Sequence, residues 1–161
     1  AAPAATPSAI PPLHLAVYAA RPDVGGICRG HGPWLVAWGA GTSAVPLRHG
    51  LGLLAGAHVG VHDDPLLVSD PRRAAAAAAS LGADRCLLLR GNGGFATGTG
   101  PAEASASLHA LEERCRVALQ ATGDPVEPTL WRLREADTGV ELARHTTWFS
   151  AQFDDREELS C

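Results

Sequence analysis

A proline stands at the start of four stretches with helical character, and short apolar runs lie between these stretches. The four prolines are Pro12, Pro33, Pro71 and Pro101, and one of the apolar runs is Cys86–Leu89. Proline suits the first turn of a helix, because its missing N–H would have no partner there. Bounded apolar runs of this length are typical of buried strands. The alternation therefore predicts an α/β fold with strands packed between helices.

The pattern assigns the segments as follows. Helices are expected at residues 13–20, 33–41, 71–81 and 101–121, with Asp70 as the N-cap of the third. Strands are expected at 24–29, at 57–64, at 86–89 and directly after the glycine-rich turn "RGNGG". We predict one core over residues 13–123, preceded by an Ala/Pro-rich segment at 1–12.

The last part of the chain, residues 124–161, shows no clear periodicity and is predicted to be irregular. Its aromatic residues are Trp131, Trp148, Phe149 and Phe153. Large apolar side chains in a segment that builds no core of its own indicate packing against something else. We expect this segment to pack on the core or on a neighbouring subunit.

Composition excludes several functions. The net charge of −4 argues against nucleic-acid binding, which needs a concentrated basic face. All basic residues are arginine, so Schiff-base chemistry, a pyridoxal phosphate anchor and a P-loop lysine are excluded. The same bias towards Ala, Gly, Arg and Pro suggests a GC-rich genome. No apolar run is long enough to span a membrane.

The cysteines and the N-terminal sequence indicate a cytoplasmic protein. The four cysteines, Cys28, Cys86, Cys115 and Cys161, are widely spaced and form no C-x-x-C pair, which favours free thiols in a reducing compartment. The N-terminal sequence lacks the basic and apolar regions of a signal peptide. Because the chain contains no methionine, we expect that it was processed or that a segment lies upstream.

Two long stretches carry a resemblance to a known family. "LHLAVYAARPDVGGICRGHGPWLVAWGAG" and "LLLRGNGGFATGTGPAEASASLHALEERCRVALQA" together resemble the class II aldolase/adducin family over about residues 7–121. The resemblance implies a three-layer α/β/α sandwich around a mainly antiparallel sheet, and tetramers with active sites between subunits. Typical members use zinc or another divalent metal to cleave or form carbon–carbon bonds of phosphorylated sugars. The adducin head has no known catalysis.

The metal-binding residues of the family are replaced here. Its His-x-His falls on Arg29-Gly30-His31, and its third histidine falls on Asn92. Its acidic residue, four positions before the helix histidine His14, falls on Ile10. The phosphate loop Gly-Asn-x-Ser and the C-terminal tyrosine of the family have no counterpart. A single histidine with an amide does not make a zinc site, and a guanidinium adds positive charge. We therefore expect no metal and no other cofactor.

The remaining groups suggest an anion site instead. Arg29 is predicted to bind a carboxylate or an enolate oxygen through a bidentate hydrogen bond, and His31 to act as acid and base. Asn92, Gly91 and Gly93 are predicted to help bind a small anionic substrate. Because Arg29 and His31 are two residues apart on a strand, we expect them on one face.

Each of these residues also has a structural interpretation. His31 suits a strand end, Arg29 an ion pair, and Asn92 a left-handed turn position. The residues His58 and His62 form either a relocated metal site or, more often for such a pattern, an exposed strand face. His14 suits a core histidine bonded to the backbone. The glycine-rich stretch at 91–100 matches no nucleotide-binding loop.

Three functions stay open at this point. The first is a divergent, metal-independent, lyase-like enzyme acting on a small keto or hydroxy acid or on a natural-product intermediate in biosynthesis. The second is a non-catalytic adducin-like binding or scaffold subunit. The third is a metal-dependent class II aldolase with relocated ligands. The first is favoured narrowly. The resemblance implies a homo-oligomer, and a scaffold subunit could instead pair with a complete paralogue.

Overall fold

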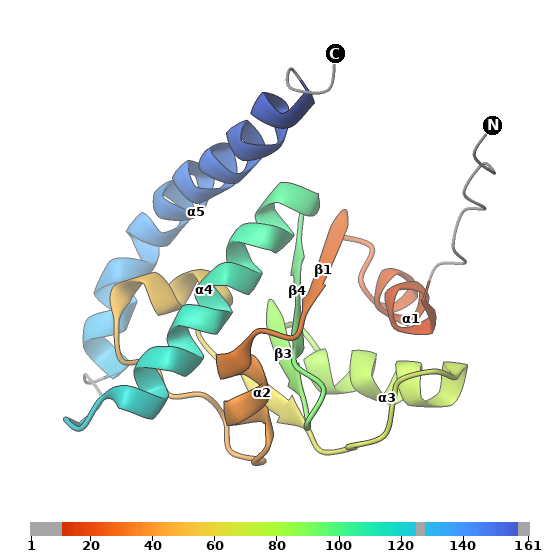
Figure 1. Cartoon of the computed structure of the whole chain (residues 1–161). Coiled ribbons are helices and arrows are strands. Elements are labelled where there is room, and N and C mark those ends of the chain that lie inside the picture. The colour runs from red at the N-terminus through yellow and green to blue at the C-terminus, as the bar shows by residue number, and fades with distance from the viewer. Residues whose placement is uncertain (1–10, 125–127, 158–161) are drawn as a thin grey trace.

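A four-stranded sheet in the order β1-β4-β3-β2 forms the middle layer, and helices cover both faces (Figure 1). The strands are β1 (Gly26–Gly30), β2 (Gly60–His62), β3 (Cys86–Leu89) and β4 (Gly94–Gly98). Strand β4 runs antiparallel to β1 and β3, whereas β2 runs parallel to β3. The computed structural model describes residues 11–124 and 128–157. The predicted α/β/α sandwich with a mainly antiparallel sheet is confirmed.

The two faces of the sheet have separate sets of helices. Helices α1 (Pro12–Ala20) and α3 (Pro71–Leu81) pack on one face. Helices α2 (Pro33–Gly39), α4 (Pro101–Gln120) and α5 (Pro128–Glu157), with the 3-10 helix η1 (Gly50–Ala55), lie on the other. Strand β3 is buried along its whole length because both layers cover it.

Local signals fix the helix starts as predicted. Proline occupies the first turn of α1, α2, α3 and α4. At α3 the Asp70 carboxylate accepts the backbone N–H of Arg73 at 3.0 Å, which is the expected N-cap. The strand expected at 57–64 is shorter than predicted, because only residues 60–62 pair with β3. Among the described residues, no helix has the length and apolar character needed to cross a membrane.

The prediction of an irregular C-terminal segment is wrong. Residues 128–157 form a single helix of 30 residues, α5. It contributes Leu142 to the core beside α4, and Phe149 packs against the same cluster, while Trp148 is 54% exposed. Trp131 and Phe153 lie outside the side chains that the structure describes. The apolar residues of α5 form no strong helical stripe, and most of its stability comes from tertiary packing, so periodicity did not identify it.

A buried arginine joins α4 to the segment around η1. The Arg114 side chain is 2% exposed and donates to the carbonyl oxygens of Val45 and Gly56, each at 2.6 Å. Longer contacts of 3.4 Å reach the carbonyls of Gly52 and Ala57. Burial lowers the pKa of Arg114 to about 10. In the described part of the chain no carboxylate forms an ion pair with this cation. Backbone carbonyls are its hydrogen-bond partners, and the charge of Asp84 acts on it from a distance.

Candidate functional site

The end of β1 and the turn between β3 and β4 lie directly against each other. A Cβ atom added to Gly93 would lie 2.1 Å from the Gly30 carbonyl oxygen and 3.0 Å from the His31 Cα. Gly93 has a φ of +73°, and its carbonyl accepts the Leu89 N–H at 2.8 Å. The backbones of His31 and Gly93 are therefore neighbours, as a site at this end of the sheet requires.

This close approach predicts different effects for two glycines of one turn. Gly93→Ala should lower the free energy of unfolding by about 3 kcal/mol, because the methyl group meets the backbone of β1 and φ is positive. Gly91→Ala, at a φ of +67° with no atom within 4 Å, should cost only about 1 kcal/mol. Urea denaturation of both variants checks this. Equal losses would show that the approach to β1 is not tight.

The Asn92 side chain turns towards the loop after β2. Its amide nitrogen donates to the carbonyl oxygens of Pro65 at 3.0 Å and Arg90 at 3.1 Å. The left-handed conformation considered for Asn92 is wrong. The positive φ angles of this turn belong to Gly91 and Gly93, and none of the non-glycine residues in the described part has one. Asn92 thus fastens two loops together at this edge of the sheet.

Arg29 lies on β1 opposite Phe95 of β4. Its neighbour by alternation, Ile27, packs on the face covered by α1 and α3, so Arg29 projects towards that face. Burial lowers the pKa of its half-buried guanidinium. Its Nε is buried without a hydrogen-bond partner, and none of the acidic side chains in the described ranges forms an ion pair with it. Arg29 is therefore a partly desolvated cation whose Nε–H is available to donate a hydrogen bond.

His14 of α1 is the residue within electrostatic reach of Arg29, and sequence reasoning did not assign it to the site. Burial is the main cause of its lowered pKa, and the positive charge of Arg29 lowers it further. The backbone hydrogen bond expected for His14 is not found in the described structure, where its buried Nδ1 has no partner. Two nitrogen-bearing side chains without acidic partners thus face the same layer.

The pKa of His14 should respond to Arg29. In Arg29→Met the pKa of His14 should rise, because the positive charge that helps to lower it is removed, and an NMR titration of the imidazole checks this.

The lowered pKa of His14 also predicts how the stability of the fold changes with pH. Since the pKa of folded His14 lies below its unfolded value of about 6.5, the unfolded chain binds more protons as the pH falls through that value. The free energy of unfolding should therefore decrease as the pH falls below about 6.5. The decrease should be smaller in His14→Gln, and urea denaturation at several pH values measures it.

His31 follows the last residue of β1, and its side chain is exposed. The strand alternation that predicted a shared face for Arg29 and His31 ends at Gly30. Among the described residues no hydrogen bond joins the side chains of Arg29, His31 and Asn92. The fold brings their backbones to one end of the sheet, while Asn92 is engaged elsewhere.

The histidines considered for a relocated metal site have separate partners. His58 Nδ1 lies 2.7 Å from an Asp84 carboxylate oxygen, and His62 Nδ1 lies 2.8 Å from the Ser80 hydroxyl. His58 is exposed and lies before β2, whereas His62 is buried, so the two histidines do not share the exposed strand face expected for them. Within the described ranges, no three His, Cys, Asp or Glu side chains gather as a metal site would require.

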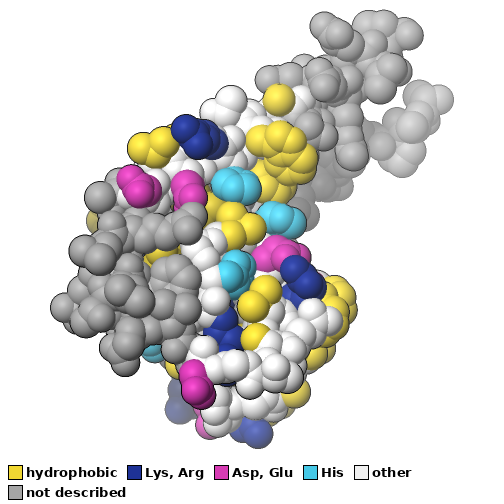
Figure 2. Space-filling model, turned by 90° about the vertical axis from the view of Figure 1, so that its left-hand side faces the viewer, with side chains coloured by type: hydrophobic (Ala, Val, Ile, Leu, Met, Phe, Trp, Pro, Cys, Tyr) yellow, Lys and Arg dark blue, Asp and Glu magenta, His cyan; other side chains and the backbone are white. Residues whose placement is uncertain are grey.

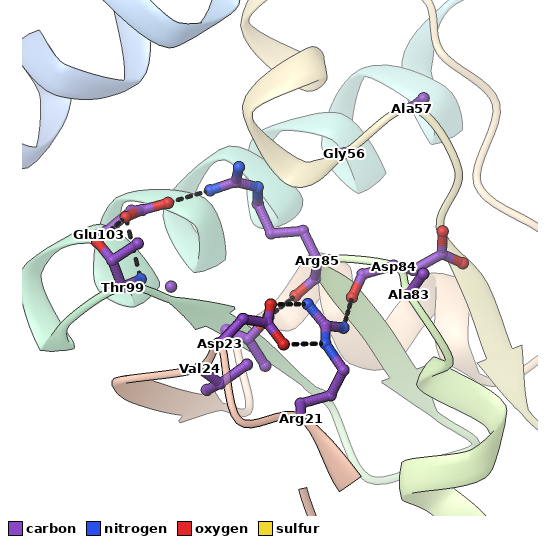
Figure 3. A pocket seen from close by; sticks show the side chains of 12 residues that line it. Arg21, Asp23, Val24, Gly56, Ala57, Ala83, Asp84, Arg85, Thr99 and Glu103 are labelled. Atoms are coloured by element: carbon purple, nitrogen blue, oxygen red, sulfur yellow. Dashed lines mark hydrogen bonds and ion pairs between the residues drawn. The ribbon is translucent and has the colours of Figure 1, made fainter. Parts of the chain in front are cut away.

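A pocket of about 400 Å³ lies at the opposite end of the sheet (Figure 3). Arg21 binds both carboxylate oxygens of Asp23, at 2.8 and 2.7 Å, and donates to the Gly82 carbonyl. Across the pocket Arg85 pairs with Glu103, which also accepts the Thr99 N–H at 3.0 Å. These charges satisfy one another. The "RPDV" stretch therefore clamps the turn after α1 to the turn after α3, which is a structural role.

Solved structures with the same fold are longer than this chain. An aldolase II superfamily protein from Pseudomonas syringae is 21% identical, with a TM-score of 0.72 over 89% of this chain and 62% of that one. L-fuculose 1-phosphate aldolase from Glaciozyma antarctica PI12 is 18% identical, with a TM-score of 0.71 over 89% and 58%. The chain thus spans about three fifths of their length. No curated protein matches it.

The sequence itself matches a family model. The model for the Class II Aldolase and Adducin N-terminal domain aligns with residues 2–119, which is well over half of the chain. The matched range includes β1 with Arg29 and the turn with Asn92, and it ends in α4. The chain therefore belongs to the class II aldolase and adducin N-terminal domain family.

Proposed function

We propose that this chain is a divergent lyase-like enzyme that breaks or forms a carbon–carbon bond in a small 2-oxo or hydroxy acid. The observation that carries the proposal is the Arg29 guanidinium, which is half-buried and has no acidic partner in the described part of the chain. It stands where the family resemblance puts the first metal-binding histidine. An enolate oxygen is an anion that such a cation binds well.

The residues at this position do not fit a divalent metal. Arg29 adds a positive charge, and the Asn92 amide nitrogen already donates to two carbonyls. Of the three histidine positions of the family, only His31 keeps an imidazole, whereas a metal centre of this kind needs several nitrogen or carboxylate ligands. In the proposed reaction Arg29, rather than a metal ion, stabilises the developing negative charge.

The bond cleavage is written for a 4-hydroxy-2-oxo acid. His31 takes the proton of the 4-hydroxyl group, and its oxygen forms the aldehyde C=O as the C3–C4 bond breaks. The electron pair of that bond forms the C2=C3 double bond, and the π pair of the 2-oxo group moves onto its oxygen. Arg29 donates hydrogen bonds to the enolate oxygen that results. The protonated His31 then returns the proton to C3, which gives an aldehyde and a 2-oxo acid. Asn92, Gly91 and Gly93 border this place, and their part in substrate binding stays a prediction.

The proposal is tested on chelator-treated protein with 4-hydroxy-2-oxopentanoate as the probe. Pyruvate release is followed by coupling to lactate dehydrogenase. We expect turnover that is unchanged by the chelator and lost in His31→Gln with the fold retained. Turnover that appears only after zinc is added would instead support the metal-dependent alternative.

Two observations favour a second candidate, an adducin-like binding or scaffold subunit. The Asn92 side chain serves the fold, and His31 points to solvent without a side-chain partner in the described structure. No turnover with any 2-oxo or hydroxy acid would favour this alternative. Assembly as a homo-oligomer stays a prediction of the family resemblance, and a cytoplasmic location stays a prediction from the cysteines and the N-terminal sequence. A small anionic substrate stays a prediction for the enzyme, based on Arg29.

A further inference from the structure

A second cavity, of about 340 Å³, opens on the face of β1 opposite to Arg29. Strand β1 contributes Cys28 to it, because alternate residues of the strand face α4. Its other walls come from α2, α4 and α5, with the side chains of Leu35, Leu108, His109, Glu112 and Phe149. This volume is in the range of small-molecule sites, and its lining is mostly apolar.

Two glycines at the cavity let side chains of α4 approach β1 and α2 closely. A Cβ at Gly30 would lie 3.0 Å from Leu108, and one at Gly32 would lie 2.4 Å from the Glu112 carboxylate. Leu108 and Glu112 are four residues apart, so they stand on the same face of α4. The missing side chains leave room for Glu112 to reach the first turn of α2.

Glu112 holds a fixed negative charge at this cavity. Its two carboxylate oxygens accept the backbone N–H groups of Trp34 at 3.2 Å and Leu35 at 2.9 Å. In the described structure no arginine or histidine pairs with it. The cationic side chain Arg144 lines a neighbouring cavity beyond His109. A carboxylate in a mostly apolar cavity without a counter-cation is complementary to a positively charged ligand.

Aromatic rings complete this complementarity. Phe149 lies edge-on to His109, with ring centroids 5.7 Å apart, and to Trp148 at 4.9 Å. Figure 2 shows histidine and hydrophobic side chains gathered on this side of the molecule. The face of an aromatic ring attracts an organic cation, most strongly where water is excluded.

We propose that this cavity binds a small organic cation with an apolar body. The ammonium group lies at Glu112, and the apolar body packs between Leu35, Leu108 and Phe149. The inference is independent of the proposed reaction, because Arg29 lies on the other face of the sheet. The thiol of Cys28 on the strand provides a way to detect the ligand.

The test uses three probes of similar shape and different charge: benzylamine, benzyl alcohol and benzoate. Alkylation of the full chain by N-ethylmaleimide is followed at Cys28 by peptide mass spectrometry. Cys86 and Cys115 serve as unreactive references, because burial raises the pKa of each to about 12. We expect saturating benzylamine to slow the alkylation of Cys28 by about tenfold. Benzyl alcohol should give the same protection only at about tenfold higher concentration, and benzoate should give none.

A matched pair of α4 variants tests the charge. Glu112→Gln should weaken the benzylamine effect about tenfold. Glu113→Gln should leave it unchanged, because Glu113 pairs with Arg116 away from the cavity. If the circular dichroism spectrum shows that Glu112→Gln is unfolded, the comparison of the three probes on the unmodified chain still tests the proposal. Equal protection by all three probes, or none by benzylamine, would overturn the proposal.

Discussion

Replacing Arg114 by methionine should lower the free energy of unfolding by about 3–5 kcal/mol, the largest stability effect expected in this chain. The guanidinium binds the carbonyls of Val45 and Gly56 at 2.6 Å, inside the layer between α4 and η1. Methionine keeps most of the apolar stem and removes every donor. The carbonyl oxygens would then be buried without partners, and each such group is costly. Urea denaturation measures the difference.

The control is Arg116→Met on the same helix. Arg116 pairs with Glu113 at 2.6 Å on the surface, where solvent screening leaves an ion pair with little effect on stability. A loss for Arg114→Met as small as the loss for Arg116→Met would show that the buried carbonyl cluster does not hold the η1 segment in place.

The second large effect concerns the proposed reaction. Arg29→Met should lower kcat for 4-hydroxy-2-oxopentanoate cleavage by about 10²–10³-fold, the usual loss for a donor to a developing oxyanion. Arg29→Lys keeps the charge but loses the bidentate geometry, so we expect an intermediate rate. KM should change less than kcat, because the enolate charge develops only in the transition state.

Arg73→Met is the matched control for this effect. Arg73 lies on α3, over the same face of the sheet, and its guanidinium pairs with Asp70 and Asp64. Its removal should leave kcat unchanged within a factor of about two, since a surface pair lost from α3 touches no reacting atom. Similar losses in Arg29→Met and Arg73→Met would indicate a general weakening of this layer and would contradict the role of Arg29.

The segments that the sequence predicted best are those with local signals. Asp70 and Pro71 set the start of α3 through a hydrogen bond within one turn, and β3 is a short apolar run buried on both faces. The strand order β1-β4-β3-β2 depends on pairings between distant residues, and periodicity carries no information on it. The family resemblance implied the three layers and a mainly antiparallel sheet, but not this strand order. Helix α5 was missed because its stability depends on tertiary contacts such as that of Leu142.

At the candidate site too, local sequence signals predicted the turn but not the side-chain contacts. The glycine-rich stretch predicted the turn before β4, and the structure places Gly93 of that turn against Gly30. The direction of the Asn92 side chain depends on the Pro65 carbonyl, which no local pattern places there. The charge of Arg29 on β1 lowers the pKa of His14 on α1, and this depends on how the helix packs on the sheet. Packing decides which side chains of different elements meet, and the periodicity of a single sequence does not predict those contacts.

Binding of oxalate, a stable mimic of the enolate of a 2-oxo acid, tests the role of Arg29 most directly. Isothermal titration calorimetry is carried out in the presence of a chelator on the unmodified chain and on Arg29→Met. We predict metal-free binding that weakens by about 10–150-fold in the variant, which corresponds to about 1.5–3 kcal/mol for hydrogen bonds to a charged group. Binding that appears only when zinc is added, or that is equal in both proteins, would contradict an anion site built on Arg29.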